Sequence, residues 1–594
     1  MKRLGIGLMA LVLSIPRVGA AQEIQTRRLS VPDGFWASGV SWDGRYFSSS
    51  YFGLPDHTPG TVALLDIGTF AVEDLTSRAD PASSAFPDWA QVSRDGGQVA
   101  YTMWNGIGWD LRVVAKGGEP RILLDMGDGY PYPTDWSPDG RHIVVPLDSL
   151  NRDNRIALVS MEDGSTRILQ SLGDRFPGPP RMSPDGRYVA YDVADEAMNL
   201  DRDIWVVSAE GGRATKVVDS PGTDLLLGWL PDGSGLLFQS DRDGTDGWWA
   251  QAVQEGRRSG GPTLVKPDMW GDPVALGMTR DGSLYYTVTV GRREAYIAGF
   301  DAGTGELNGS LQRISDGYAL YGGRIAWSPD GGQVAFVARE GRPAWGAGRD
   351  KIVVWTGPGS ELRELTPNVA FIGQLAWEPD GGSFLVTALR RGVEGMYRVD
   401  ARTGDVTDVW TGDWPRHFAL TRDGRTAYFH KRRPPEGVVA LDLASGQVRE
   451  LYVKPPDGMR EFDMRYGFGG LQLSHDERTL LLRSYGSEEV LSLPTSGGRP
   501  RVLLRLEDGE RAVALRWAPD DASAFVTTRR GWDTPDIDQW RISLDDGTRE
   551  HVARCTQPDR AAPCHGQISP DGRRIAFGVG EARSEVWVAR GFGR

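Results

Sequence analysis

The chain has 594 residues, and its 80 acidic residues outnumber 67 lysines and arginines, giving a formal net charge of −13. A surface of this sign repels phosphate, so the composition excludes nucleic acid and anionic membranes as expected partners. The length exceeds what one hydrophobic core serves, and the 77 glycines indicate short strands joined by many turns.

Residues 1–21 have the pattern of a secretory signal peptide. Lys2 and Arg3 precede an apolar run from Leu4 to Ile15, and small residues follow at positions 19–21. The run is about half as long as the roughly 20 residues of a spanning helix, so an uncleaved anchor is the weaker alternative. We expect a periplasmic or secreted mature protein without a membrane span.

A short strand is expected next, at Thr26 to Ser30, and beyond it a turn of the form Ser/Thr-x-Asp-Gly recurs along the chain. Successive copies lie 43 to 53 residues apart, which matches the length of four short strands and their turns. Each repeat therefore predicts one four-stranded blade of a β-propeller. The aspartates of the twelve copies are Asp43, Asp95, Asp139, Asp185, Asp232, Asp281, Asp330, Asp380, Asp423, Asp476, Asp520 and Asp571.

The repeat around Asp139 shows how the residues specify a blade. Pro138 presets the backbone of the turn, and Gly140 admits a positive φ. The runs from His142 to Val145 and from Arg155 to Val159 are β-branched and apolar, so both predict strands. Outside the signal peptide the sequence has no helical periodicity, and the predicted fold class is all-β.

Twelve blades exceed the four to eight that close around one axis. The sequence therefore predicts two tandem six-bladed β-propellers, at residues 24–305 and 306–594, although a division into five and seven blades stays open. The last repeat ends after its third strand, Glu585 to Ala589, so the strand at Thr26 to Ser30 is expected to complete that blade. Leu311 to Ser315 is expected to play the same part for the second half.

The Ser-Pro-Asp-Gly turns carry a family resemblance. Together with the segment Phe238 to Gly244, Phe-Gln-Ser-Asp-Arg-Asp-Gly, they resemble the repeats of TolB-type β-propellers, which are similar to the propellers of dipeptidyl peptidase IV and prolyl oligopeptidase relatives. The resemblance covers essentially the whole mature chain. It implies the propeller fold but no single function, because such repeats occur in binding proteins, peptidase gating domains and a few enzymes.

The position just before each turn is apolar in every repeat. Such a series at one repeat position is interpreted as packing between neighbouring blades. Five of these positions hold tryptophan: Trp136, Trp229, Trp327, Trp377 and Trp517.

One residue earlier, where the side chain points to the other face of the strand, three consecutive repeats of each half are polar and three are small. The polar residues are Gln91, Asp135 and Arg181 in the first half and Gln472, Arg516 and Gln567 in the second. If these strands line a central channel, each ring has a polar crescent with an arginine suited to a carboxylate. These six are the candidate ligand-binding residues. The alternative, that the polar groups only satisfy one another and water, stays open.

No catalytic constellation is recognisable. The chain lacks a Gly-x-Ser-x-Gly motif and residues for an α/β hydrolase domain, so it is not a complete serine peptidase. The seven histidines have no metal-binding spacing, and the calcium-like segment Asp241 to Asp246 lacks a closing glutamate and is interpreted as a hairpin turn. We expect no catalytic residue, no metal and no cofactor.

The two cysteines, Cys555 and Cys564, lie close together in a proline-containing segment. In an exported protein they are expected to form a disulfide. A zinc site with His551 and His565 is the alternative, which the missing Cys-x-x-Cys spacing disfavours.

These observations predict an exported, non-catalytic β-propeller scaffold that binds a protein or peptide partner through the loops at one mouth of its rings. Two alternatives stay open. One is an enzyme acting on a carbohydrate or small metabolite with acids from separate blades, such as Asp135 near Arg181. The other is an accessory propeller of a separately encoded peptidase. The sequence does not fix the oligomeric state.

Overall fold

The computed structural model describes residues 24–592 apart from positions 33–34, 51–60, 78–85, 106–107, 128, 149–153, 174, 195–201, 270–272, 291–293, 302–306, 316–317, 319, 342–347, 391–392, 413–414, 416, 432–436, 454–469, 484–488, 508–509, 519, 531–535, 557–565 and 580–582. The expected signal peptide lies outside the described residues. Within them the secondary structure is all β, with fifty strands, twelve antiparallel sheets and no helix.

Six of the sheets form one group, which we call the N-terminal set. It consists of β2 (Gly39–Val40), β3 (Tyr46–Ser50), β4 (Val62–Asp66) and β5 (Val72–Asp74); β6 (Phe86–Val92), β7 (Gln98–Trp104), β8 (Trp109–Ala115) and β9 (Arg121–Gly127); β10 (Tyr130–Pro131), β11 (Asp135–Trp136), β12 (His142–Asp148), β13 (Asn154–Ser160) and β14 (Thr166–Gly173); β15 (Arg181–Met182), β16 (Tyr188–Ala194), β17 (Arg202–Ser208) and β18 (Thr215–Val218); β19 (Asp224–Trp229), β20 (Gly235–Ser240), β21 (Gly247–Gln254), β22 (Arg257–Arg258) and β23 (Thr263–Lys266); and β24 (Pro273–Met278), β25 (Ser283–Val290), β50 (Arg583–Arg590) and β1 (Gln25–Leu29).

The other six sheets form the C-terminal set. It consists of β28 (Leu320–Trp327), β29 (Val334–Gly341), β30 (Gly348–Trp355) and β31 (Arg363–Leu365); β32 (Ala370–Trp377), β33 (Ser383–Arg390), β34 (Val393–Asp400) and β35 (Val406–Thr411); β36 (Phe418–Leu420), β37 (Thr426–Lys431), β38 (Gly437–Asp442) and β39 (Val448–Val453); β40 (Leu471–Leu473), β41 (Thr479–Arg483), β42 (Glu489–Pro494) and β43 (Arg501–Arg505); β44 (Glu510–Trp517), β45 (Ser523–Arg530), β46 (Asp536–Ser543) and β47 (Arg549–Thr556); and β48 (Gln567–Ile568), β49 (Arg574–Val579), β26 (Glu294–Phe300) and β27 (Leu307–Arg313).

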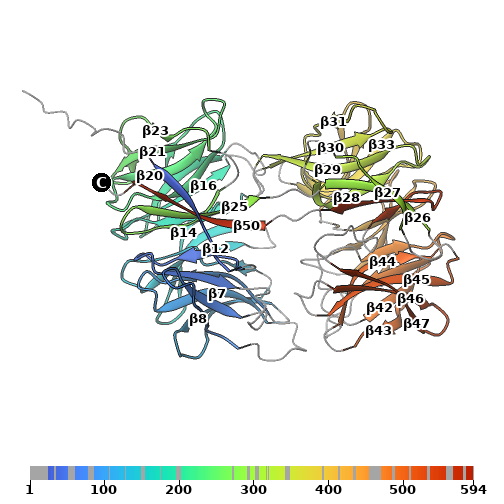
Figure 1. Ribbon diagram of the computed structural model, residues 1–594, viewed down its shortest axis with the longest axis horizontal. Coiled ribbons are helices and arrows are strands. Elements are labelled where there is room, and N and C mark those ends of the chain that lie inside the picture. The colour runs from blue at the N-terminus through green and yellow to red at the C-terminus, as the bar shows by residue number, and fades with distance from the viewer. Residues whose placement is uncertain are drawn as a thin grey trace, which may run out of the picture.

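The two sets exchange one strand in each direction. After β25 the chain crosses to pair β26 with β49, and after β49 it returns to pair β50 with β25. The red arrow of β50 therefore lies among blue and green strands in Figure 1, while the green β26 and β27 lie beside red ones. We call the sheet of β24, β25, β50 and β1 the N-terminal exchange sheet, and the sheet of β48, β49, β26 and β27 the C-terminal exchange sheet.

This exchange corrects the expected strand assignment. The pairing of Thr26 to Ser30 with Glu585 to Ala589 is confirmed, because β1 pairs with β50 in antiparallel register. However, β50 is seated beside β25 and not beside β49, so strand pairing crosses the expected boundary between residues 305 and 306 in both directions. Physically, β26 and β50 both follow a second strand, and each contains a run of four apolar residues, Ala295 to Ala298 and Val586 to Ala589, with the same pattern of buried and half-buried positions, so either strand satisfies either sheet.

Hydrophobic clusters join neighbouring sheets. In the N-terminal set each sheet shares a buried cluster with the next, and the exchange sheet shares one with the β2–β5 sheet through Leu276, Tyr285 and Phe47. In the C-terminal set five of the six neighbouring pairs share such a cluster. The sixth pair, the β44–β47 sheet and the C-terminal exchange sheet, shares none among the described residues, since the cluster around Phe300 belongs to the exchange sheet alone. We call this contact the seam.

The repeated turn is held by one hydrogen-bond pattern. In the turn after β2, the Ser41 hydroxyl donates to Asp43 Oδ1 at 2.6 Å, and the same oxygen accepts the backbone N–H of Arg45 at 3.0 Å. Gly44 takes a φ of 74°, which a residue with a Cβ rarely adopts. The Ser/Thr-to-Asp bond occurs in nine of the twelve turns. The repeat signature thus specifies the reversal between the first and second strands in nine of the twelve sheets.

Candidate functional site

A small cavity lies where the first strands of all six N-terminal sheets meet. Its lining residues come from β2, β6, β11, β15, β19 and β24 and from the turns that follow β2, β6 and β15. The space open to the centres of water-sized spheres is about 40 Å³. This volume holds about three waters, whereas pockets for drug-sized ligands measure roughly 300–1,000 Å³. The space between these strands is therefore nearly filled by their own side chains.

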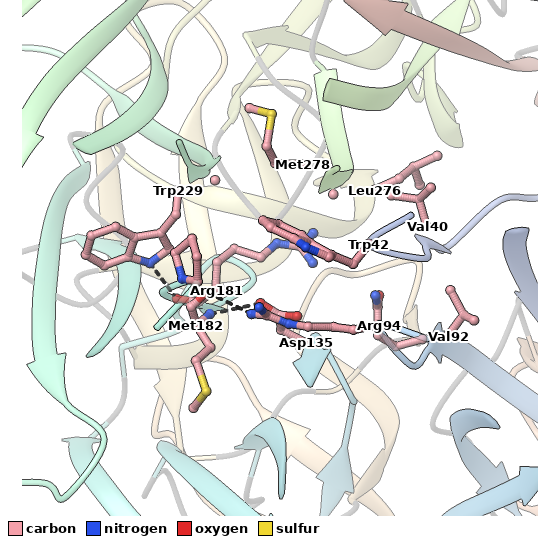
Figure 2. A pocket seen from close by; sticks show the side chains of 14 residues that line it. Val40, Trp42, Val92, Arg94, Asp135, Arg181, Met182, Trp229, Leu276 and Met278 are labelled. Atoms are coloured by element: carbon pink, nitrogen blue, oxygen red, sulfur yellow. Dashed lines mark hydrogen bonds and ion pairs between the residues drawn. The ribbon is translucent and has the colours of Figure 1, made fainter. Parts of the chain in front are cut away.

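Arg181 lies across this cavity, as Figure 2 shows. Its Nη1 donates to the carbonyl oxygen of Thr134 at 2.5 Å, and its Nη2 donates to the carbonyl oxygen of Ala275 at 2.5 Å. The guanidinium thereby bridges the β10–β14 sheet to the N-terminal exchange sheet. Burial lowers the pKa of Arg181, and the nearby carboxylate of Asp135 acts in the opposite direction.

Asp135 is satisfied by backbone groups. Its Oδ1 accepts the N–H of Trp136 at 2.8 Å, and its Oδ2 accepts the N–H of Met182 on the next sheet at 2.9 Å. Arg94 Nη2 lies 3.9 Å from Asp135 Oδ2, and the Arg94 guanidinium stacks on the Trp42 ring at 5.1 Å. Arg94 and Trp42 were missed by the sequence analysis. Both occupy the turn position that holds proline in most repeats, and that departure was the available signal.

Gln91 explains why neighbouring sheets need small residues. The side chain is 4% exposed, and a Cβ added to Gly39 would lie 2.4 Å from Gln91 Oε1. Gly277 is under the same constraint, because its Cβ would approach Val40 Cγ1 to 2.9 Å. The structure thus brings Gln91, Asp135 and Arg181 together at one cavity, with Gly39 and Gly277 making room for the packed neighbours.

The second predicted crescent is placed differently. Gln472, Arg516 and Gln567 stand on the first strands of three consecutive C-terminal sheets, and Gln567 is exposed while the other two are half-buried. Arg516 reaches into the seam, where its guanidinium lies 4.6 Å from the Phe525 ring and 5.3 Å from the Phe300 ring. Its Nε and Nη2 are buried and have no hydrogen-bond partner within the described ranges of the chain. Burial lowers the pKa of Arg516 to about 10.

The tryptophans before the turns pack between neighbouring sheets, which confirms their predicted role. Each indole N–H also donates to a backbone carbonyl of the preceding sheet, that of the residue one place before the tryptophan or its equivalent. Trp136 donates to Gln91 O at 3.1 Å, and Trp229 donates to Arg181 O at 2.9 Å. The bonds of Trp327, Trp377 and Trp517 are equivalent. The two positions that the sequence singled out therefore form one recurring contact.

Two turns of the C-terminal set, after β40 and after β44, depart from the repeat. Glu477 and Asp521 occupy the glycine position with φ of 60° and 49°. Asp521 accepts the N–H groups of His475 and Asp476 at 2.9 and 2.8 Å, and its Oδ1 lies 2.7 Å from His475 Nδ1. Backbone strain at these positions is thus offset by hydrogen bonds between adjacent sheets.

The sequence also predicted a hairpin turn and a disulfide. The segment from Asp241 to Asp246 is a turn between β20 and β21, closed by a hydrogen bond from Gly244 N to Asp241 O at 2.8 Å. Cys564 lies outside the described residues, so the disulfide with Cys555 and the alternative zinc site stay predictions. Among the described residues no cluster of three or more metal-ligating side chains occurs, and no helix is long and apolar enough to cross a membrane.

Comparisons with known proteins concern the fold. No family model and no curated protein matches the chain. The chain is similar to the solved structure of a putative TolB from Agrobacterium tumefaciens, with 14% identity over 49% of this chain and 99% of that one and a TM-score of 0.36. It is also similar to TolB from Acinetobacter baumannii, with 14% identity over 70% and 81% of the two chains and a TM-score of 0.24. For the tricorn protease the identity is 11% over 93% of this chain and 63% of that one, with a TM-score of 0.30.

These neighbours are of the TolB and peptidase-propeller type that the repeat turns resemble. At such identities the likeness extends to the fold alone, and no ligand, partner or reaction is carried over from it.

Proposed function

We propose that the chain is an exported, non-catalytic scaffold of two six-bladed β-propellers that binds a protein or peptide partner. Six sheets in each set, with buried clusters that run from one sheet to the next, support the two six-bladed rings. The strand exchange supports a fixed connection between the rings, because two chain segments cross between them. Each ring would present its connecting loops at its two mouths.

The observation that carries partner binding is that two buried guanidinium nitrogens of Arg516, Nε and Nη2, have no hydrogen-bond partner among the described residues. A buried hydrogen-bond donor without a partner costs about 1–3 kcal/mol, and a charged one costs more. Arg181, the equivalent residue of the first crescent, avoids this cost by donating to two carbonyls, whereas in the described part of the chain the Arg516 guanidinium lies against the rings of Phe300 and Phe525, which accept no such bond from Nε or Nη2. An acceptor supplied from outside would remove the cost.

A carboxylate is the acceptor that this geometry favours. Arginine presents parallel N–H groups that match the two oxygens of a carboxylate, and a partly dehydrated site strengthens the pair. We therefore assign the seam of the C-terminal set as the partner site, with an aspartate or glutamate side chain or a C-terminal carboxylate of a peptide against Arg516.

The enzymatic alternative has less support. Glycosidic chemistry in the channel requires two facing carboxylates, and Asp135 is the one acid among the described lining residues of the cavity. Both of its oxygens already accept backbone N–H groups.

A peptide-binding experiment tests the proposal. We expect a library of synthetic acidic peptides with free carboxyl termini to contain members that bind the full chain, and the amidated Asn/Gln counterparts to bind more weakly. Arg516→Met is expected to weaken binding by roughly tenfold or more, because a charge-assisted bidentate pair is lost. Arg573→Met, which removes an exposed arginine of the same set, is the matched control and should leave binding unchanged. Equal binding by wild type and Arg516→Met would overturn the assignment.

A further inference from the structure

Asp88 is a half-buried carboxylate on β6, three residues before the channel residue Gln91. Its Oδ2 accepts the hydroxyl of Tyr130 at 2.7 Å, and its Oδ1 accepts the backbone N–H of Trp89 at 2.8 Å. Both donors are neutral, and among the described residues no arginine, lysine or histidine forms an ion pair with this carboxylate. Burial raises the pKa of Asp88. The acid is therefore held in place without a counter-charge.

The two residues that donate to this carboxylate, Tyr130 and Trp89, belong to a group of aromatic rings in contact with one another. The Trp89 ring meets the Tyr132 ring edge to face at 6.3 Å, Tyr132 lies 5.8 Å from Tyr130, and Tyr130 meets Trp109 edge to face at 4.8 Å. Trp109 and Tyr132 are buried, while Trp89 and Tyr130 are half-buried. The array thus has two buried members and two that are partly accessible to solvent, and Asp88 hydrogen-bonds to the two partly accessible residues.

The backbone at Trp89 is bent to build this arrangement. Trp89 has a φ of 33°, and the pairing of β6 with β7 shifts register between Asp88 and Ala90. A positive φ is rare for a bulky residue and costs of order 1–3 kcal/mol. The bulge places the Trp89 N–H on Asp88 and the indole beside Tyr132, so the strained residue completes both the polar and the aromatic parts of the array.

We propose that Asp88 and the rings of Trp89, Tyr130 and Tyr132 form a binding site for an organic cation, an ammonium or guanidinium group. The faces of aromatic rings attract such cations, and a partly dehydrated carboxylate supplies the counter-charge. The excess of acidic residues over the whole chain favours the approach of a positive ligand. The site lies in the N-terminal set, and it stands independently of the carboxylate site at Arg516.

Calorimetric titration of the full chain with tetramethylammonium and with methylguanidinium tests this proposal. We expect saturable binding of at least one of the two cations by the wild type. Asp88→Asn keeps the size and the acceptor for Tyr130 but removes the charge, and it should weaken binding by roughly tenfold or more. Asp125→Asn, which alters an exposed acid on β9, is the matched control and should bind like the wild type.

Three results would overturn the site. The first is no saturable binding of either cation, and the second is unchanged cation binding by Asp88→Asn. The third is saturable binding of glucose, a carbohydrate, that Asp88→Asn abolishes while neither cation binds. A thermal unfolding scan of Asp88→Asn distinguishes loss of the site from loss of the fold. If that variant unfolds early, Tyr130→Phe, which removes only the hydroxyl donor, provides the second measurement, and unchanged binding by it and by Trp89→Leu would likewise contradict the proposal. Because the probes are small cations, failure here leaves the acidic-peptide assay at Arg516 unaffected.

Discussion

The two sets are built from one repeat but use the position before the tryptophan differently. In the N-terminal set, Arg181 bridges two carbonyls across a cavity of about 40 Å³, and all six neighbouring sheet pairs share a buried cluster. In the C-terminal set, the equivalent Arg516 has two buried nitrogens without partners, and the seam beside it shares no such cluster among the described residues. The same residue type therefore stabilises one set and is left available in the other.

This difference suggests how a repeat protein separates stability from binding. Where the crescent arginine finds acceptors inside the protein, it closes the structure, and where it does not, its unmet hydrogen-bonding capacity becomes affinity for an outside acceptor. Four experiments test this difference between the two sets, beginning with the one expected to have the largest effect.

Removal of β50 should unfold the N-terminal set, although the deletion is at the C-terminal end. Val586, Val588 and Ala589 are at most 2% exposed and pack against sheets of the N-terminal set. Losing this strand also leaves β1 and β25 without their shared partner. The free energy lost with these contacts is expected to exceed the free energy of unfolding of a typical domain, roughly 5–15 kcal/mol. Hydrogen exchange on a chain ending at residue 582 should show lost protection in β2–β25 and retained protection in β28–β47.

A synthetic peptide of residues 583–592 provides the control for this deletion. Added in excess, it should restore protection in the N-terminal set. Loss of protection first in the C-terminal set would contradict the observed exchange of strands.

The arginine pair gives the next largest effect. Arg181→Met leaves the carbonyls of Thr134 and Ala275 without their donor and should destabilise the protein by about 3–5 kcal/mol. Arg516→Met removes an uncompensated buried charge and should be neutral or stabilising by about 1–4 kcal/mol. Thermal unfolding by calorimetry measures both variants. An equal loss of stability in the two variants would show that the two arginines do not differ in the way described.

Much of the fold could be predicted from the sequence, because the repeat turn is locally determined. The pattern of serine or threonine, aspartate and glycine fixes the reversal after most of the first strands, and the aspartate recurs in all twelve turns, so the twelve copies predict twelve sheets. The exchange of β26 and β50 could not be predicted. Both strands contain a run of four apolar residues that is buried in the same pattern, and the choice between two equivalent sheet edges depends on the path of the chain in space.

The candidate site was predicted only in part. Repeat alignment found Arg181 and Arg516, but it could not say which of them has internal acceptors. That depends on the backbone carbonyls of Thr134 and Ala275, which come from two other sheets and leave no side-chain signal. Asp88 was missed because it precedes the repeat signature, and its partner Tyr130 belongs to the next sheet.

Acid should weaken the C-terminal set before the N-terminal one. A lowered pKa means that the folded state favours the charged carboxylate, so its stabilising effect is present above the ordinary value near 4 and is lost as the pH falls through the lowered pKa. Eleven described acids of the C-terminal set have lowered pKa values and none has a raised one, whereas the N-terminal set has six lowered and two raised. The two raised pKa values belong to Asp88 and Asp224, where burial is the main cause. The lowered ones in the C-terminal set are those of Asp330, Glu364, Asp400, Asp423, Asp442, Asp476, Glu510, Asp520, Asp538, Asp546 and Asp571, and in the N-terminal set those of Asp66, Asp95, Asp139, Asp163, Asp185 and Asp281.

Calorimetry from pH 7 down to about pH 3 checks this order, with the two transitions assigned by the shift that Arg181→Met causes in the N-terminal one. Protonation of Asp88 and Asp224 removes a cost of the folded state as the pH falls, so it partly offsets the loss in that set. If the unfolding temperature of the N-terminal transition falls faster with decreasing pH than that of the C-terminal one, the prediction is wrong.

The tryptophan contacts should show the smallest effect and the least difference between the sets. Trp136→Phe and Trp377→Phe each remove one indole N–H bond, to Gln91 O and Ala326 O, and leave a smaller ring in a packed site. Each should cost about 1–3 kcal/mol, the value of a lost buried hydrogen bond. Urea unfolding of the two variants compares them directly. Similar costs would show that this contact belongs to the repeat itself, while the arginine pair differs because of what surrounds it. A much smaller cost for Trp377→Phe would mean that the C-terminal set is loosely packed well away from the seam, and the availability of Arg516 would then reflect general looseness rather than a site kept for a ligand.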